Sequence, residues 1–353
     1  MNQQEESEVK IERITENVFQ LNIRHFQNRY VNVYALLGDT VTLIDTGHAN
    51  QSCVSMLKGA LLELGYGLEQ ISHIIYTHPH LDHLGGGLAI NETYEHIKNI
   101  ACAGAVDIFR DYAEFSRQFV VRSKEFTEKM GYGAHASLIK ETKDFFRIYN
   151  DCTPYRGLII NTQVEDGDIL KIGDFELEVL FTPSHSPWDT SLYDTKRGLF
   201  YSGDFLLERG TSFLSYITGS DLDCYWNALK KVEGYGNNIN IVLPGHGRAI
   251  EHPKMVINRC IRNFHIYENR ILKKVGEKKA TVYETAHALV KGRMKDVVLW
   301  YRYIGMVHTY FIKLMKENKV KEVRENGKLY YCLTGQGREY YKSAALMNLL
   351  TAV

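Results

Sequence analysis

The chain has 353 residues, which exceeds one typical domain and predicts two. Apolar residues make up 44% and charged residues 24%, as in an ordinary globular protein. Lys+Arg and Asp+Glu both total 42, so no global basic excess favours nucleic acid, although a local basic patch is compatible with this balance. Residues 1–6 are acidic and polar, unlike a secretory signal, and no stretch approaches the roughly 20 apolar residues of a membrane span.

The cysteines are widely spaced and form no C-x-x-C pair. They are Cys53, Cys102, Cys152, Cys224, Cys260 and Cys332. This pattern indicates reduced, small apolar residues rather than a disulfide framework, so we expect a cytoplasmic protein. The same spacing argues against cysteine as a metal ligand.

The first part of the chain predicts three strands followed by a helix. The strands cover residues 14–23, 31–37 and 41–45, and the helix covers residues 50–66. Gly38-Asp39 is expected to form the turn between the second and third strands. Asp45 ends the third strand, where it either accepts a hydrogen bond from a metal-ligating histidine or caps the turn.

A run of metal-ligating residue types follows the next predicted strand. Residues 71–77 are β-branched and apolar, which indicates a buried strand, and Pro79 ends it. His78 and His80 are two residues apart, so both can point to one side of an extended segment and bind one ion. The loop leaves the C-terminal end of a strand, where layered α/β proteins form their sites.

Asp82 and His83 come after this turn, where they can face a second ion. Solvation on a loop explains one histidine well, but it explains three histidines and an aspartate poorly. Gly85, Gly86 and Gly87 then indicate a tight bend or close packing of the backbone. We expect a short helix after the loop and a strand at residues 100–102.

Residues 105–150 contain no proline, many charges and a heavy aromatic load. The helical spacing of Ile108, Tyr112, Phe115 and Phe119 predicts two or three helices inserted between groups of ligands. We expect most of these aromatic residues to form an ordinary amphipathic core face. As an alternative, some of them line the substrate entrance.

From residue 157 the alternating pattern returns. It predicts strands at residues 168–171, 175–181, 190–194, 199–202 and 239–243, and a helix at 221–234. His185, Asp204 and His246 each follow one of these strands, close to glycine or proline. This recurrence of ligand types at strand ends is the strongest evidence for function in the sequence.

The chain changes character again from about residue 253. Helices are expected at residues 253–277, 281–291 and 301–318, and a hairpin at 320–333 turns at Asn326-Gly327. Two helices followed by a basic hairpin are the outline of a winged helix.

These motifs resemble those of the metallo-β-lactamase superfamily over residues 12–250. The order and spacing match, as do the flanking Asp45-Thr46-Gly47 and Pro244-Gly245-His246-Gly247. The resemblance implies an α/β protein with an αββα sandwich and two metal ions at one edge. It assigns residues 12–252 to a catalytic domain with a helical insertion at about 105–150. Residues 253–353 become a linker helix and a winged-helix-like domain, similar to that of one lactamase-like branch.

The resemblance also implies a ligand set. His78, His80 and His185 would hold the first ion, Asp82, His83 and His246 the second, and Asp204 would bridge them. Imidazole and carboxylate ligands suit zinc, which we expect, and also iron or manganese. A hydroxide shared by two such ions has a pKa of about 7 and can attack a carbonyl carbon or phosphorus. Asp82 is the expected catalytic residue, which orients the nucleophile and takes a proton.

Asp204 distinguishes branches of this family. β-Lactamases generally lack the bridging aspartate, whereas glyoxalase II-like thioesterases, lactonases and nucleases have it, so antibiotic hydrolysis is not the expected role. The chain departs from its relatives at Ser184-His185 and Trp188, where they often carry a Gly-His pair and a second glycine. It also lacks the glutathione-binding segment of glyoxalase II.

Four functions are compatible with the sequence. The first is a hydrolase of small esters, thioesters of CoA or acyl carriers, or lactones, which fits the aromatic insertion and the neutral charge. The second is a metal-dependent endoribonuclease, which would need the lysines and arginines between residues 273 and 295 to form a basic path. The third is a persulfide-dioxygenase-like iron enzyme that uses only the first metal position.

The fourth is a binding module with a structural metal, which is disfavoured because four ligands close a structural zinc site. As partners we expect a small-molecule substrate, no membrane, and a homodimer as one option. The charge of the predicted hairpin nearly cancels, because Lys321, Arg324 and Lys328 are interleaved with Glu322 and Glu325. We therefore expect the C-terminal domain to pack against the rest of the protein and not to bind nucleic acid.

Overall fold

The computed structural model describes residues 9–24, 29–130, 155–210, 214–290 and 297–350, which are the described residues below. The strands are β1 (Lys10–Arg13), β2 (Val18–Arg24), β3 (Tyr30–Leu37), β4 (Val41–Ile44), β5 (Ile71–Ile75), β6 (Lys98–Cys102), β7 (Ile160–Val164), β8 (Ile169–Ile172), β9 (Phe175–Phe181), β10 (Thr190–Asp194), β11 (Leu199–Gly203), β12 (Ile241–Pro244), β13 (Val320–Glu325) and β14 (Lys328–Leu333).

The α-helices are α1 (Gln51–Glu63), α2 (Leu81–Asn91), α3 (Val106–Arg110), α4 (Tyr112–Lys129), α6 (Leu222–Gly234), α7 (Pro253–Glu277), α8 (Val282–Val290), α9 (Val297–Lys316) and α10 (Gly335–Leu350). Short 3-10 helices are η2 (Leu68–Gln70), η3 (Ala103–Ala105) and η6 (Tyr216–Thr218). Among these helices, none combines the length and apolarity that a bilayer crossing requires.

Two sheets pack face to face. The first has the strand order β1-β2-β3-β4-β5-β6-β7, and the second has the order β12-β11-β10-β9-β8. Alternate residues of β3 point to opposite sides: Tyr34 and Leu36 lie between the sheets, whereas Val31 and Val33 face α1 and α2. This period of two is what a strand buried on both faces requires.

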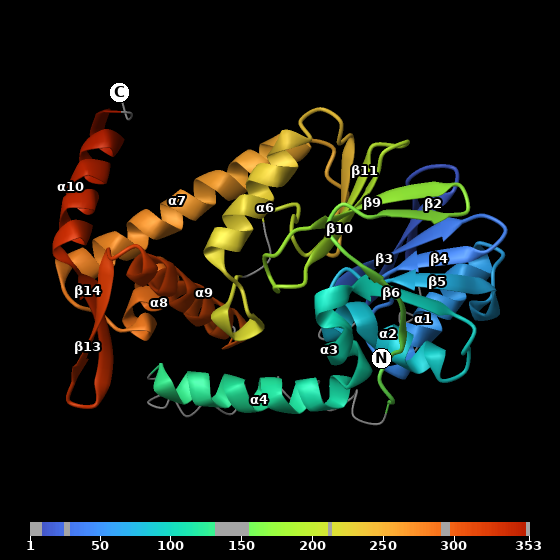
Figure 1. Ribbon diagram of the computed structural model, residues 1–353, viewed down its shortest axis with the longest axis horizontal. Coiled ribbons are helices and arrows are strands. Elements are labelled where there is room, and N and C mark those ends of the chain that lie inside the picture. The colour runs from blue at the N-terminus through green and yellow to red at the C-terminus, as the bar shows by residue number, and fades with distance from the viewer. Residues whose placement is uncertain (1–8, 25–28, 131–154, 211–213, 291–296, 351–353) are drawn as a thin grey trace, which may run out of the picture.

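Helices cover both outer faces of the sheet pair (Figure 1). The helices α1, α2 and α3 pack on the first sheet, while α6 and α7 pack on the second. The predicted αββα sandwich is therefore confirmed. In the first sheet, β5 pairs in parallel with both β4 and β6, so the loop after Ile75 leaves the carboxyl edge of the sheet as predicted.

Three strands differ from the sequence prediction. The strand expected at residues 14–23 begins only at Val18, because residues 14–17 form a turn in which Ile14 N donates to Val18 O at 2.9 Å. The strand β1 lies before this turn, was not predicted, and pairs with β2 as a hairpin. The strand β7 was not predicted. It lies at the sheet edge with most of its side chains exposed, and its pattern is therefore weak.

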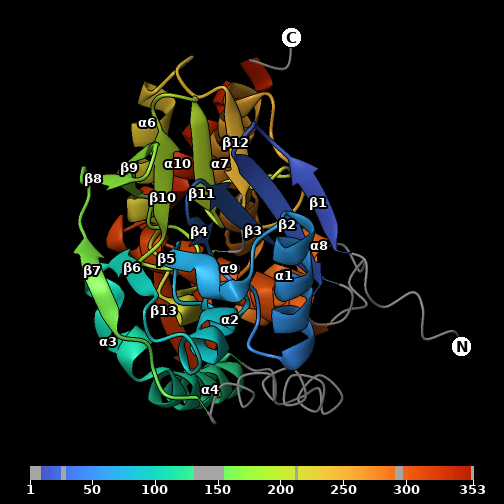
Figure 2. The same ribbon diagram turned by 90° about the vertical axis from the view of Figure 1, so that its right-hand side faces the viewer.

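The long helix α4 occupies the first half of the predicted insertion and extends beneath α3 toward the C-terminal helices (Figure 1, Figure 2). Residues 131–150 of that insertion lie outside the described residues. At the C-terminal side, α8, α9 and the hairpin β13–β14 follow in the expected order. The winged-helix interpretation and the domain boundaries stay predictions.

Candidate metal centre

The loop between β5 and α2 carries the first two histidines. His78 and His80 lie in this loop, and His80 is the N-cap residue of α2. Asp82 and His83 occupy the first turn of that helix. The end of β5 and the start of α2 therefore place these four side chains close together in the chain.

The three glycines of α2 allow this helix to lie close to the neighbouring backbone. A Cβ atom on Gly85 would lie 2.4 Å from Ala49 N, and one on Gly86 would lie 2.3 Å from Thr46 O. The Thr46 hydroxyl donates to the carbonyl of His83 at 2.8 Å. Of the two roles expected for the glycines, close packing is therefore the one they fulfil, and it fixes the helix start beside β4.

The other predicted ligands arrive from the second sheet. His185 lies in the connection between β9 and β10, Asp204 directly follows β11, and His246 follows β12. Two residues beside them must be small. A Cβ on Gly203 would meet Thr77 at 2.8 Å, and a Cβ on Gly245 would meet His83 Cε1 at 2.7 Å.

The structure brings all seven predicted ligands together in overlapping groups. The groups whose donor atoms lie within 4.8 Å of one another are His78, His80 and His185; His78, His83 and Asp204; and Asp82, His83 and His246. The first and third groups coincide with the two ligand triads that the resemblance implies. Asp204 shares the second group with a histidine from each triad.

The carboxylate of Asp204 faces both triads with different oxygens. Its Oδ1 atom lies 3.6 Å from His83 Nε2 and 3.5 Å from His246 Nε2. Its Oδ2 atom lies 3.8 Å from His185 Nε2. This is the arrangement that a bridging carboxylate needs.

The chemistry of these residues fits divalent metal ions. The Nε2 atoms of His78 and His83 are buried and make no hydrogen bond to any described residue. Buried polar atoms normally have a partner, so an electrophile at this point would satisfy them. Burial, together with the neighbouring histidines, holds the pKa of His78 well below its usual value and lowers the pKa of His80 to about 3. Both rings are then neutral, as metal ligation requires.

His83 and Asp204 are charged members of the site, in contrast to the neutral His78 and His80. Burial lowers the pKa of His83, but the carboxylates of Asp45 and Asp82 outweigh it and raise that pKa to about 10. Burial opposes ionisation of Asp204, but His246, His83 and His185 keep its pKa below the usual value. Metal binding would displace the His83 proton, so proton release should accompany loading.

Asp45 performs the first of the two roles considered for it. Its Oδ2 atom lies 2.8 Å from His83 Nδ1, which fixes the ring so that Nε2 points to the site. It also accepts bonds from Thr77 N at 2.9 Å and Thr77 Oγ1 at 2.8 Å. Asp45 has φ +59°, a conformation that aspartate tolerates better than most residues.

Two supporting residues were not found from the sequence. Asp189 is buried and accepts bonds from Ser184 Oγ at 2.6 Å and Ser186 Oγ at 2.7 Å, so it clamps the residues on both sides of His185. Asn32 is buried in β3 and donates to Pro244 O and Gly247 O, each at 2.8 Å, which holds the His246 loop. A polar Asn within an otherwise apolar strand was the available signal for Asn32.

The family model of the metallo-beta-lactamase superfamily matches residues 27–246. The chain belongs to this superfamily. The match covers the strands from β3 to β12 and every residue of the candidate metal centre. This metallo-beta-lactamase superfamily member is accordingly a metal-dependent hydrolase.

Related proteins and structures are consistent with this assignment. The superfamily member is 21% identical to an atrochrysone carboxyl ACP thioesterase of Aspergillus fumigatus over 86% of this chain and 79% of the relative. It is 23% identical to an acyl-coenzyme A thioesterase of Homo sapiens over 65% of this chain and 78% of the relative. A beta-lactamase domain protein from Burkholderia ambifaria has the same fold, with a TM-score of 0.79, 17% identity, and coverage of 92% of this chain and 94% of its own.

Proposed function

We propose that the protein hydrolyses thioesters, with acyl-CoA or acyl-carrier conjugates as the substrate class. The observation that carries this proposal is the position of Asp204, whose two oxygens face the two ligand triads. The resemblance associates a bridging aspartate with thioesterases, lactonases and nucleases rather than with β-lactamases. Two thioesterases among the relatives favour the first of these three classes.

Two divalent ions at this site would supply a hydroxide at neutral pH and a Lewis acid for the substrate carbonyl. His78, His80 and His185 would hold one ion, and Asp82, His83 and His246 the other. Asp82 Oδ2 lies 3.3 Å from His246 Nε2, and the side chain is about a quarter exposed. It is therefore accessible to a nucleophile and can orient it and take its proton.

An aromatic contact joins α4 to the segment that carries His185. Trp188 follows His185 in the same connection, and its ring makes an edge contact with Phe115 of α4 at a centroid distance of 6.5 Å. The insertion thus reaches the segment that carries a proposed metal ligand. This contact supports the alternative in which some aromatic residues of the insertion line the substrate entrance.

The test is a substrate panel on purified, metal-analysed protein. Thioesters, lactones, phosphodiesters and single-stranded RNA are compared side by side, and we expect turnover of thioesters and about two ions per chain. Removal of the ions with a strong chelator should abolish turnover. Zinc, iron and manganese are then added back separately to find which metal restores turnover. RNA cleavage without thioester turnover would replace this proposal with the endoribonuclease alternative, and oxygen-dependent persulfide consumption would replace it with the dioxygenase alternative.

A further inference from the structure

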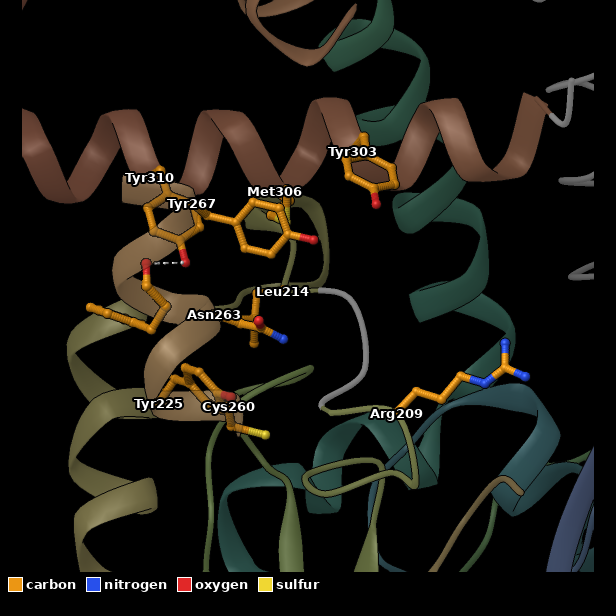
Figure 3. A pocket seen from close by; sticks show the side chains of 10 residues that line it. Arg209, Leu214, Tyr225, Cys260, Asn263, Tyr267, Tyr303, Met306 and Tyr310 are labelled. Carbon is orange, nitrogen blue, oxygen red and sulfur yellow. Dashed lines mark hydrogen bonds between the residues drawn. The ribbon is translucent and has the colours of Figure 1, made fainter. Parts of the chain in front are cut away.

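A cavity of about 140 Å³ lies where the second sheet's loops meet the C-terminal helices. Its walls come from the segment after β11, from α6, from α7 and from α9 (Figure 3). Figure 3 shows Asn263 and Tyr267 directed into the space, with Arg209 on the opposite side. None of these residues belongs to the metal centre.

One wall of the cavity is attached to the metal centre through Asp204. The segment that follows Asp204 leads directly to Glu208 and Arg209. Glu208 pairs with Arg248, two residues after His246, at 2.6 Å, and its carbonyl accepts a bond from Arg259 of α7 at 2.9 Å. The Arg209 side of the cavity is therefore held between the His246 loop and α7.

A second wall of the cavity is hydrogen-bonded to the connection between β9 and β10, which carries His185. Ser220 Oγ donates to His185 O at 3.2 Å and accepts from Ser215 N at 2.9 Å, directly after Leu214 of the cavity wall. Helix α9 packs closely here, because a Cβ on Gly305 would lie 2.2 Å from Ser215 Oγ. The cavity is thus bounded by one segment that follows Asp204 and by another that is hydrogen-bonded to the backbone of His185.

The size and lining of the cavity restrict what it can hold. An apolar cavity of roughly 150 Å³ accommodates a benzene molecule, so this one has room for about one six-membered ring. Phe264, Tyr267 and Tyr310 supply aromatic surface, and the Tyr310 hydroxyl is already bonded to Phe264 O at 3.1 Å. Aromatic rings pack favourably on one another edge-on or offset.

The amide of Asn263 makes no hydrogen bond to any described residue, although it faces this cavity (Figure 3). A saturated acyl chain would displace water from this amide without replacing its hydrogen bonds, which lowers affinity. A ring with a hydroxyl group would replace them. The lining therefore selects against a plain alkyl chain.

We propose that this cavity binds the acyl part of the substrate and that it takes a single aromatic ring bearing a hydrogen-bonding substituent such as a hydroxyl group. The inference rests on the proposed thioester hydrolysis, because the ring would be carried on the carbonyl that reaches the metal centre. It narrows the substrate class from acyl thioesters in general to hydroxyaryl ones.

Direct binding tests the cavity without turnover. The metal-loaded protein is titrated calorimetrically with 4-hydroxyphenylacetate, phenylacetate and cyclohexylacetate. We expect the hydroxyaryl acid to bind about tenfold more tightly than the cyclohexyl acid, the effect of one hydrogen bond with the half-buried Asn263 amide. Asn263→Leu should remove most of this preference, whereas Asn258→Leu, at an exposed position of the same helix, should retain it.

Turnover of the three matching CoA thioesters separates the two proposals. Hydrolysis with a hydroxyaryl preference that Asn263→Leu removes supports both. Hydrolysis with no ring preference, or with one that both leucine variants change equally, overturns the cavity assignment alone. Binding of the hydroxyaryl acid without hydrolysis of any thioester supports the ring site and overturns thioester hydrolysis. Circular dichroism of both variants confirms that they are folded.

Discussion

The hydroxyl of Tyr301 on α9 donates a hydrogen bond to Oγ of Ser123 on α4 at 2.9 Å, and both side chains are buried. Nearby, Phe126 of α4 and Tyr216 of η6 contact the ring of His308 at centroid distances of 5.2 and 5.1 Å. Helix α4 of the predicted insertion and helix α9 therefore pack against each other through buried side chains. The expected packing of the C-terminal part against the rest of the chain is seen here directly.

Replacing Tyr301 with Phe should weaken the packing of α9 against α4. The change removes one buried hydrogen bond, so we expect the free energy of unfolding to fall by about 1 kcal/mol. Urea denaturation of wild type and variant measures this difference. Tyr330→Phe on the partly exposed hairpin is the matched control, and an equal loss in both variants would contradict the structural role of the Tyr301 bond.

Phe115 and Phe119 are expected to respond differently to truncation. Phe115 is partly buried and contacts Trp188, so Phe115→Ala should raise KM, or change acyl preference, with a smaller effect on kcat. Phe119 is 5% exposed within the core, so Phe119→Ala should cost about 3–5 kcal/mol of stability. Steady-state kinetics and urea denaturation distinguish the two effects. Equal responses of all substrates to Phe115→Ala would make Phe115 a core residue as well.

Asp204→Ser should leave the fold intact and remove most hydrolysis. The serine cannot reach both ligand triads, so the distance between the ions and the acidity of their shared water would change. We expect kcat to fall by about a hundredfold or more, by analogy with other losses around metal sites. Asp174→Ser, in an exposed turn, is the control. Wild-type turnover by the Asp204 variant would remove this residue from the mechanism.

Asp189→Asn should weaken metal binding without a change in fold. An amide can replace only part of the set of bonds that the carboxylate accepts from Ser184 and Ser186, so the His185 connection would loosen. Losing such a supporting bond typically reduces metal affinity by about 10–100-fold. Competition with a chromophoric chelator measures this. Unchanged affinity together with reduced thermal stability would show that Asp189 supports only the loop.

His308 should make stability depend on pH. Its burial, and to a smaller extent the charge of Lys129, lowers the pKa of His308 from 6.5 to about 4. As pH falls below 6.5, the unfolded chain takes up a proton that the folded chain does not, so stability declines until pH falls to about 4. Between pH 7 and pH 5 this group should remove about 2 kcal/mol of unfolding free energy.

The His308→Gln variant isolates this contribution, because every other titrating group is common to both proteins. Urea denaturation at the two pH values should show a smaller decline for the variant than for wild type. Parallel declines in the two proteins would mean that His308 is protonated in the folded state.

The sequence predicted which residues the fold would bring together at the candidate metal centre, because they follow strands. His78, His185 and His246 each come after an apolar run, and parallel strands end at a common edge. Asp189 could not be found in this way, since its role depends on a turn that brings two serines to its carboxylate. The cavity lined by Asn263 was equally hidden, because its walls come from four segments that are distant in sequence.

The local sequence pattern also limited which strands could be predicted. The run at 14–23 was expected to be one strand, but its first four residues form the turn between β1 and β2, in which Ile14 N donates to Val18 O. Strand β7 carries exposed polar residues and is defined by its pairing with β6 rather than by its own composition. Elements whose identity depends on a neighbour are those that a single sequence describes least well.

The two sheets contribute different ligands, so bound ions would act as a cross-link between them. Backbone bonds already join the sheets at this edge, from Thr190 N to Thr77 O at 2.9 Å and from Asn32 N to Gly245 O at 2.8 Å. Each bound ion would add a tether, and its binding free energy would contribute to docking of the two halves of the sandwich. Metal removal should therefore accelerate amide hydrogen exchange first in the residues around Thr77 and Gly245, long before the outer helices respond.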